Sequence, residues 1–308
     1  MTRNWLNNTS LHTCLLILVV LSFGSEQAVL SEEELPTEAV EEFVTVLEQI
    51  KRNYVFEQSD PVLIEAAIRG MVTSLDPYSR YLNAEELKQF ESSSSVKSSN
   101  SRVWSIEDLD SGITYLDINF FHLSLSDKVV EILSKRRLDK GLLLDLRDNG
   151  GGFVDSAVEL AGLFLNEKLV VHTRGRSPAA NRYLSTDKDT PFADVPLLIL
   201  VNEGTASAAE IFSAALQDHE SGLVAGTNTY GKGSVQSLIY TQYGAIQITT
   251  SLNYRPSGSS IQGEGVRPDI ELSNAGSEAT NNELSSEMRN LIKEARRRFE
   301  MVAVDNTN

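Results

Sequence analysis

Cysteine is almost absent from this chain of 308 residues, in which Cys14 is the only one. Cys14 begins an apolar run, residues 14–23, that follows Arg3 and precedes small residues, as in a secretory signal peptide. We expect residues 1–28 to be a cleaved signal and the protein to be exported or periplasmic; retention by an uncleaved N-terminal anchor is the alternative. The mature chain would then lack cysteine, which excludes disulfides, a thiol nucleophile and a cysteine-bound metal.

Positive charge and long apolar runs are also scarce. The chain has 27 Lys and Arg against 43 Asp and Glu, a formal charge of −16. This balance argues against nucleic acid as a partner, because phosphates are bound through Lys and Arg. Beyond the signal, apolar runs such as residues 197–201 have the length of a buried strand. We therefore expect no stable membrane span after signal cleavage.

Histidine is rare as well, so a Ser-His-Asp triad would have to choose its base arbitrarily. No dinucleotide fingerprint or P-loop is present, and we expect neither a cofactor nor a metal. The four histidines are His12, His122, His172 and His219.

The N-terminal part of the mature chain is expected to be a small helical module, residues 36–91. Asp60 and Pro61 are typical of the start of a second helix, and Asn83 of the start of a third. Residues 92–102 are rich in serine and predict a flexible linker. The first helix is predicted by apolar residues at helical spacing, namely Val40, Phe43, Val44, Leu47 and Ile50.

Strand and helix patterns alternate over residues 103–272, and a charged helix and tail are expected over residues 273–308. The apolar segments 141–146 and 196–201 predict buried strands, each followed by a helix. This alternation is typical of the α/β class. Further strands are expected at residues 113–118, 222–226, 234–240 and 245–252, and helices at 126–135, 155–165 and 207–216.

Two strand-to-helix junctions carry possible chemistry. Residues 144–152 end in three glycines, whose N–H groups could hold a phosphate or a developing oxyanion. A glycine turn that only closes a βα unit explains this cluster as well. In the second junction, residues 201–211, Ser207 falls near a helix N-terminus, where negative charge is stabilised. Taken alone, this segment is explained more simply if Ser207 or Thr205 only caps the helix.

A serine nucleophile needs a base, and Lys232 is the candidate. It lies between Gly231 and Gly233 at the edge of an expected strand, where the backbone can approach another segment closely. A lysine whose pKa is lowered by burial can act as a base near neutral pH. Gln236, four residues on, could orient the amine. An exposed lysine in a glycine-rich hairpin is the alternative.

Three linked motifs, residues 145–152, 204–211 and 230–236, together closely resemble the C-terminal processing peptidases, also called tail-specific proteases. Residues 74–79 and 265–270 resemble two further segments of that family. The resemblance implies a crotonase-like or ClpP-like core of stacked βα elements.

The resemblance also implies the roles of single residues. Ser207 would attack the peptide carbonyl and form an acyl-enzyme, Lys232 would be the general base, and Gln236 would hold Lys232. The backbone N–H groups implied for the oxyanion hole are those of Ala208 and Gly152, with Gly151 as the neighbouring possibility.

Most members of this family carry a PDZ domain, of about a hundred residues, after the helical module. Here only residues 92–101 stand at that place, too few to fold such a domain. We therefore expect an exported Ser/Lys endopeptidase that cleaves protein substrates near their C-termini and receives them from an adaptor protein. The alternative is a catalytically silent or partner-activated interaction protein. An acyl-CoA enzyme of crotonase type is disfavoured by export and by the Ser/Lys pair.

Overall fold

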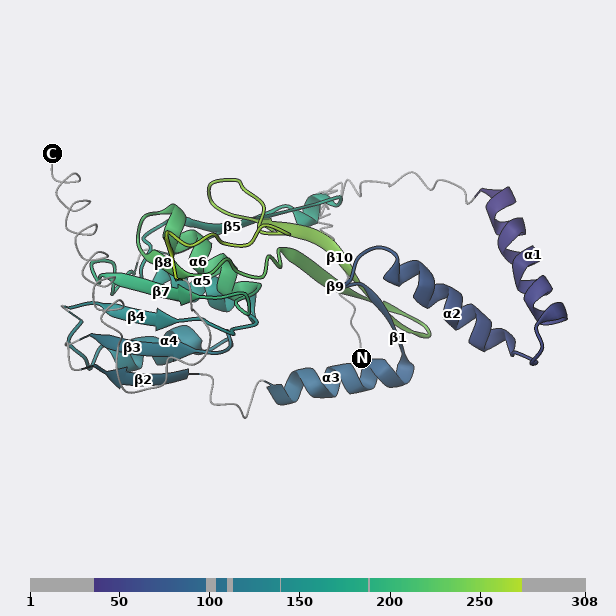
Figure 1. The fold of residues 1–308 in the computed structure, drawn as a ribbon, viewed down its shortest axis with the longest axis horizontal. Coiled ribbons are helices and arrows are strands. Elements are labelled where there is room, and N and C mark those ends of the chain that lie inside the picture. The colour runs from purple at the N-terminus through teal and green to yellow at the C-terminus, as the bar shows by residue number, and fades with distance from the viewer. Residues whose placement is uncertain (1–35, 98–103, 110–112, 139, 188, 273–308) are drawn as a thin grey trace, which may run out of the picture. The chain divides into compact units, whose positions relative to one another are not determined.

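The computed structural model describes residues 36–97, 104–109, 113–138, 140–187 and 189–272 (Figure 1). The expected signal, the C-terminal helix after residue 273 and the end of the Ser-rich segment lie outside these residues. The chain forms two compact units, residues 1–63 and 64–308, which are described separately. No helix of the described residues is both long and apolar enough to cross a membrane.

The first unit contains helix α1 (Thr37–Asn53) and the start of helix α2 (Asp60–Thr73). An ion pair between Lys51 and Asp60, 2.6 Å apart, joins the two helices. Both helices were expected. The apolar stripe of α1 buries no residue, and Phe43 is 45% exposed.

The second unit begins with the end of α2, strand β1 (Arg80–Asn83) and helix α3 (Ala84–Lys97). Asn83 caps α3 as predicted: its side-chain oxygen accepts the N–H groups of Glu85 and Glu86 at 3.1 and 3.0 Å. The Glu86 carboxylate accepts the Asn83 N–H in return at 2.9 Å, which completes a capping box.

Helix α3 differs from the prediction at its C-terminal end. It was expected to end before the linker that begins at residue 92, but it continues to Lys97, so the first part of the predicted Ser-rich linker is helical. Serine lowers helix stability by less than about 0.7 kcal/mol per residue relative to alanine. Four serines therefore do not end a helix that a capping box has already started.

The core of the second unit is a six-stranded sheet in the order β11-β8-β7-β4-β3-β2. Figure 1 shows β8, β7, β4, β3 and β2 lying in that order, with helices α4, α5 and α6 behind them. Every residue of β4 and β7 is buried, as expected for parallel strands covered on both faces. The parallel strands are β3 (Thr114–Ile118), β4 (Leu142–Asp145), β7 (Leu197–Val201), β8 (Leu223–Gly226) and β11 (Ile270–Glu271), and β2 (Trp104–Asp108) pairs antiparallel to β3.

Three helices cover one face of this sheet and contribute to one large apolar core. They are α4 (Leu125–Leu133), α5 (Val154–Gly162) and α6 (Ala208–Asp218). Each was predicted within a few residues of its observed bounds. Because β4 and β7 are parallel neighbours, the chain leaves both strands at the same edge of the sheet. The two glycine-containing junctions therefore meet there, as ligand sites of α/β sheets commonly do.

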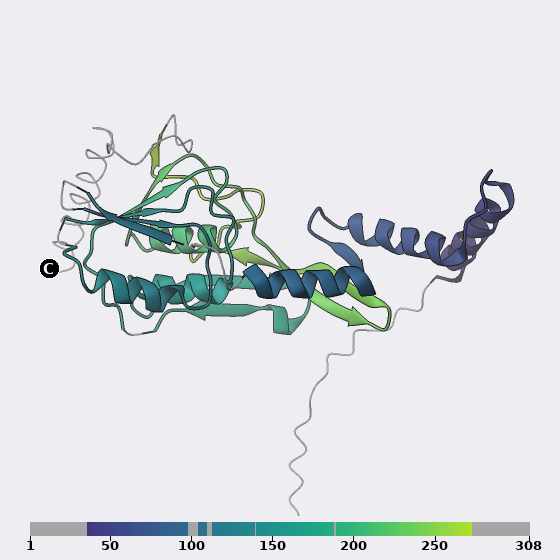
Figure 2. The same ribbon diagram turned by 90° about the horizontal axis from the view of Figure 1, so that it is seen from below.

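An antiparallel sheet forms the second layer, with β10 (Gly244–Tyr254) at its centre. Strand β9 (Ser234–Thr241) pairs with one edge of β10, and β1 and β5 (Leu169–Gly175) pair with the other. Strand β6 (Arg182–Ser185) pairs with β5, and a short 3-10 helix (Pro178–Ala180) lies between them in sequence. Figure 2 shows the β9–β10 hairpin extending from the core alongside α3, where the Tyr240 hydroxyl donates to Glu91 at 3.1 Å.

The α/β class is confirmed, but five strands were missed. Strands β9 and β10 were predicted, whereas β1, β5 and β6 of the same sheet were not. Strands β2 and β11 were missed as well.

Candidate functional site

Hydrogen bonds join the two junctions at the sheet edge. The Ala206 N–H donates to the Asn149 carbonyl at 2.8 Å, and the buried Thr205 hydroxyl donates to the Leu146 carbonyl at 2.7 Å. The Asp148 N–H donates to the Asn202 side-chain oxygen at 2.8 Å, and the Asn202 side-chain NH₂ donates to the Asp148 carboxylate at 3.0 Å. The loop after β4 is therefore fixed directly against the loop after β7.

Gly151 is the point of closest approach between these loops. A Cβ atom built on it would lie 2.8 Å from the Ser207 Cβ and 2.9 Å from the Ala208 nitrogen. Its φ of +98° is also a conformation that side chains disfavour. The glycine is thus required both by space and by backbone conformation, and it allows the glycine cluster to lie against Ser207.

The free N–H groups near Ser207 belong to Gly152 and Ala208. The N–H of Gly151 is already used, because it donates to the Asn149 side chain at 2.8 Å. Within the described residues, neither Gly152 nor Ala208 donates its N–H to a protein acceptor. Of the two glycines expected near the oxyanion hole, Gly152 is therefore the one with an available donor.

Ser207 lies at the N-terminus of α6 with an unusual backbone. Its φ is +59°, a region that non-glycine residues rarely adopt. Such strain persists only where surrounding contacts hold it, and it gathers at functional sites. The residue is half-buried, so its side chain retains access to solvent.

Glu210 holds the backbone of Ser207 and of Lys232 together. Its carboxylate is fully buried, and its Oε2 atom accepts the Ser207 N–H at 2.7 Å and the Lys232 N–H at 2.9 Å. Because both nitrogens reach the same oxygen, they lie no more than 5.6 Å apart. Oε1 accepts the Thr229 hydroxyl and the Gly231 N–H, each at 2.6 Å.

The Lys232 side chain lies over an aromatic ring. Its Nζ atom is 5.4 Å from the centre of the Tyr78 ring. The structure records no hydrogen bond between this amine and the Ser207 hydroxyl, although the two backbones are adjacent. Gln236, expected to hold Lys232, instead donates to the Thr249 hydroxyl at 3.2 Å.

A buried ion pair fixes the end of β4 just before the glycine loop. The Arg147 guanidinium donates to the Asp145 carboxylate through Nε and a terminal nitrogen, with the shortest N–O distance at 2.6 Å, and the Tyr115 hydroxyl donates to the same carboxylate at 2.9 Å. Burial raises the pKa of Tyr115 above its usual range, and the negative charge of Asp145 raises it further. Burial and the Asp145 charge also raise the pKa of Asp117.

None of the described histidines is hydrogen-bonded to Ser207. His122 contacts the Ser124 hydroxyl at 3.2 Å, and burial lowers its pKa. His172 is stacked between Tyr183 and Tyr254, with ring centres 5.4 and 5.3 Å apart. The His219 ring nitrogen lies 2.7 Å from the Leu169 carbonyl oxygen.

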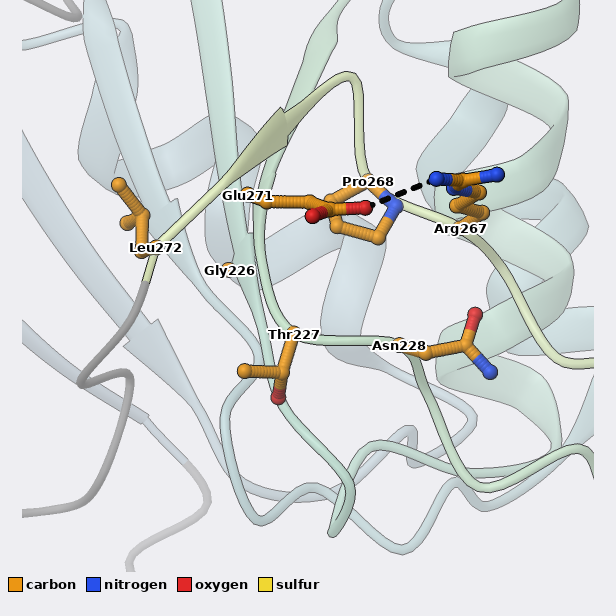
Figure 3. Close-up of a pocket in the computed structure, with 7 residues that line it drawn as sticks. All are labelled: Gly226, Thr227, Asn228, Arg267, Pro268, Glu271 and Leu272. Atoms are coloured by element: carbon orange, nitrogen blue, oxygen red, sulfur yellow. Dashed lines mark hydrogen bonds and ion pairs between the residues drawn. The ribbon is translucent and has the colours of Figure 1, made fainter.

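A separate cavity of about 680 Å³ lies at the ends of β8 and β11 (Figure 3). None of the expected catalytic residues lines it. Within the described residues, no group of His, Cys, Asp or Glu side chains is arranged to hold a metal ion. The lining residues are Gly226, Thr227, Asn228, Arg267, Pro268, Glu271 and Leu272, and an ion pair of 3.1 Å joins Arg267 to Glu271.

Sequence reasoning missed two residues of this site. Glu210 stands three positions after Ser207, the spacing of a capping box, and that pattern could have indicated its bond to the Ser207 N–H. Its bonds to residues 229–232 come only from the tertiary fold. Tyr78 belongs to a segment that the sequence linked to the family, but no local pattern brings it to Lys232.

Comparisons with known proteins match both parts of the chain. Residues 112–272 match peptidase family S41, and residues 21–86 match the activating protease CtpB N-terminal domain. The carboxy-terminal-processing protease of Bartonella bacilliformis is 31% identical over 319 aligned positions, covering 74% of each chain. The chloroplastic carboxyl-terminal-processing peptidase 1 of Arabidopsis thaliana is 39% identical over 54% of this chain and 35% of its own length. The tail-specific protease of Haemophilus influenzae is 36% identical over 51% of this chain and 24% of its own.

Solved structures agree in fold. The photosystem II D1 C-terminal processing protease has a TM-score of 0.53 and 26% identity, over 65% of this chain and 55% of that one. A lipoprotein from Streptococcus agalactiae has a TM-score of 0.57 at 19% identity, over 85% of this chain and 98% of that one, which shows the fold alone. With more than half of its residues matched to one family model, and a relative of 31% identity across most of its length, this chain belongs to peptidase family S41.

Proposed function

We propose that this protein is an exported serine endopeptidase in which Ser207 is the nucleophile and Lys232 the general base. The observation that carries the proposal is the Glu210 carboxylate, whose Oε2 accepts the N–H groups of both residues at 2.7 and 2.9 Å. Two residues 25 positions apart in sequence are thereby held side by side at the N-terminus of α6. No described histidine offers a comparable geometry.

The chemistry follows from these positions. The Ser207 Oγ forms a bond to the peptide carbonyl carbon while its proton passes to the neutral amine of Lys232. The carbonyl oxygen becomes an oxyanion, which the N–H groups of Gly152 and Ala208 and the N-terminus of α6 stabilise. The intermediate collapses to an acyl-enzyme when Lys232 returns the proton to the leaving amine. Water then releases the acyl group by the same steps in reverse.

The proposed substrates are polypeptides cut near their C-termini, as the names of the relatives suggest. The alignment with the Bartonella bacilliformis protease includes 74% of the 308 residues of this chain, which is about 228 residues. About 90 of the 319 aligned positions therefore have no residue in this chain. That number is close to the size of the PDZ domain that the sequence lacks. We therefore infer that an adaptor protein delivers the substrate in its place.

The test is a pair of activity measurements on the purified chain without residues 1–28. It should degrade casein, and a fluorophosphonate probe should label Ser207. The variants Ser207→Ala and Lys232→Ala should each lose turnover by at least about a thousandfold. Lys128→Ala, which removes an exposed lysine of α4, is the control and should retain full activity. Casein cleavage that survives Ser207→Ala would refute the assignment.

One observation favours a second candidate, a protein that is silent until a partner binds. Lys232 Nζ has no hydrogen bond to Ser207, and Gln236 is bonded to Thr249 instead of Lys232. Catalytic hydrogen bonds are often long before substrate binds, so this geometry is compatible with either candidate. Labelling of Ser207 in the isolated protein favours the active enzyme. Labelling that occurs only after addition of a cell-envelope fraction favours partner activation.

Specificity for chain ends has its own test. A peptide with a free C-terminal carboxylate and the same peptide with a C-terminal amide should be cleaved at different rates if the carboxylate is recognised. Equal rates would show that the enzyme does not recognise the C-terminal carboxylate of its substrate.

A further inference from the structure

The loop between α2 and β1, at residues 76–79, approaches the side chain of Lys232, which the proposed function assigns as the base. It belongs to the same compact unit as Ser207 and Lys232. Its Tyr78 ring lies under the Lys232 amine, with 5.4 Å between Nζ and the ring centre. An aromatic face attracts an ammonium group at this distance. The mechanism proposed above gives this loop no role.

The loop has a fixed shape because Asp76 binds it from inside. The Asp76 carboxylate accepts the N–H groups of Tyr78 and Ser79, both at 2.8 Å, and the Ser79 hydroxyl at 2.9 Å. Burial favours the protonated carboxyl, but these hydrogen bonds outweigh it and hold the pKa of Asp76 below its ordinary value. The backbone that carries the Tyr78 ring is therefore anchored on both sides.

The same loop also reaches Gln236 through one intermediate residue. The buried Ser79 hydroxyl accepts the Thr249 N–H at 3.2 Å, and the Thr249 hydroxyl accepts the Gln236 amide at 3.2 Å. Lys232 and Gln236 are thus both connected to residues 76–79, one through an aromatic face and the other through hydrogen bonds.

The Tyr78 hydroxyl group stays protonated in its surroundings. Burial raises the pKa of Tyr78, a hydrogen bond with Gln262 opposes the rise, and the neighbouring Tyr230 and Glu210 add to it. A neutral Tyr78 side chain contacts Lys232 through its ring face and carries no negative charge. The contact therefore orients the amine without forming an ion pair that would have to be broken during catalysis.

We propose that Tyr78 is a positioning residue for Lys232: its ring sets where the amine stands beside Ser207, and residues 76–79 are part of the active site. This inference rests on the proposed function of Lys232 as the base. It assigns to the segment before the protease core a direct effect on the rate of the chemical step.

The matched variants are Tyr78→Phe, which keeps the ring face, and Tyr78→Leu, which removes it. Tyr78→Phe should retain kcat within about threefold, whereas Tyr78→Leu should lower kcat about tenfold or more with KM changed less than threefold. A loss of kcat at a nearly unchanged KM, restored by the phenylalanine ring, is the result expected of a residue that positions the base.

Tyr81→Leu is the control for loss of a tyrosine ring from the same segment. It removes a comparable contact, in which the Arg69 guanidinium lies 5.5 Å from the Tyr81 ring centre, but not one at the site. It should leave both kcat and KM unchanged. A loss of kcat that Tyr81→Leu shares, or that Tyr78→Phe does not restore, would point to a structural role and overturn the inference.

A second measurement does not depend on activity or on the folding of the leucine variant. Lysine amines in Ser207→Ala protein are dimethylated with ¹³C-formaldehyde, and the Lys232 signal is identified by its absence in the Ser207→Ala, Lys232→Arg double variant. A ring below the amine should shift this signal upfield from those of the exposed lysines, and Tyr78→Phe should retain the shift. A Lys232 signal among the others would overturn the inference.

Different results would overturn the proposed role of Lys232 and the proposed role of Tyr78. If Lys232→Ala retains activity, the proposed function itself is wrong. If Lys232→Ala is inactive while Tyr78→Leu has a normal kcat, only the role of Tyr78 is wrong.

Discussion

The proposed nucleophile and the proposed base lie next to strands of two different sheets, and they are held in different ways. Ser207 follows β7 of the buried parallel sheet, and hydrogen bonds from residues 202–206 lock its loop to the loop after β4. Lys232 precedes β9 of the antiparallel sheet, and its side chain rests on Tyr78 from the N-terminal segment. Glu210 links the two backbones.

This difference divides the site into a preorganised half and an adjustable half. The strained backbone of Ser207 and the free N–H groups of Gly152 and Ala208 are fixed by the core before any substrate binds. The Lys232 amine depends on side-chain contacts outside the parallel sheet. Variants of the first half should therefore affect stability and activity together, and variants of the second half mainly the rate.

The largest effect is expected where the halves meet. In Glu210→Gln, one carboxylate oxygen becomes an NH₂ group that faces donors instead of accepting from them. We expect kcat to fall at least a hundredfold and the free energy of unfolding to fall by about 2–3 kcal/mol. Steady-state kinetics and urea unfolding measure both. A stable variant with normal kcat would show that Glu210 does not couple the halves.

Gly151→Ala probes the preorganised half. The added Cβ would lie within 3 Å of Ser207 and Ala208, so the glycine loop must move away from the nucleophile. We expect kcat to fall by about a hundredfold, comparable to the loss of one oxyanion donor. Gly258→Ala is the matched control, since Gly258 has a similar φ of +93° but nothing within 4 Å. It should lose only about 1 kcal/mol of stability and no activity.

Thr205→Val tests the hydrogen bonds between the loops with little change of shape. It leaves the Leu146 carbonyl and the Asn202 N–H buried without their Thr205 partner. The free energy of unfolding should fall by about 2 kcal/mol. Thr227→Val, which removes a solvent-exposed hydrogen bond to Glu203, should change it by less than about 0.5 kcal/mol. Equal losses in the two variants would contradict the role assigned to the buried bonds.

The smallest effect is expected from acid acting on the loop beside Lys232. The pKa of Asp76 is lowered in the folded protein, so its contribution to stability is present above about pH 4, the unfolded value, and is lost as pH falls below it. Asp76→Asn should be less stable than the parent at pH 7 by about 1 kcal/mol, and the difference should narrow below pH 4. Urea unfolding at several pH values measures it; a constant difference would exclude this linkage.

The parallel sheet could be predicted from sequence because its strands are continuous apolar runs followed by helices. Residues 197–201 are an example: all are buried. The antiparallel layer was harder to predict. Strand β6 has only half-buried or exposed side chains, and β1 has four residues, so neither shows a clear period of apolar residues.

The candidate site divides in the same way. Ser207, Lys232 and the glycine loop were predicted because each lies in a distinctive local motif, and the structure brings these segments together. The contacts of Gln236 and Tyr78 depend on which strands pair across β10, and that pairing is not encoded in any short segment. The bond from the Ser207 N–H to Glu210 could be predicted from their spacing in the sequence. The three bonds that Glu210 accepts from residues 229–232 form only in the folded protein.

Glu210 has a consequence for how the site tolerates change. One side chain satisfies four donors from two segments, so no single second substitution can restore what its loss removes. Its position, though three residues from the nucleophile and turned into the protein, should be among the least permissive in a saturation mutagenesis screen. The exposed turn at Glu220, between α6 and β8, should by contrast accept insertions, because the carboxylate, and not the connecting chain, sets the distance between the backbones of Ser207 and Lys232.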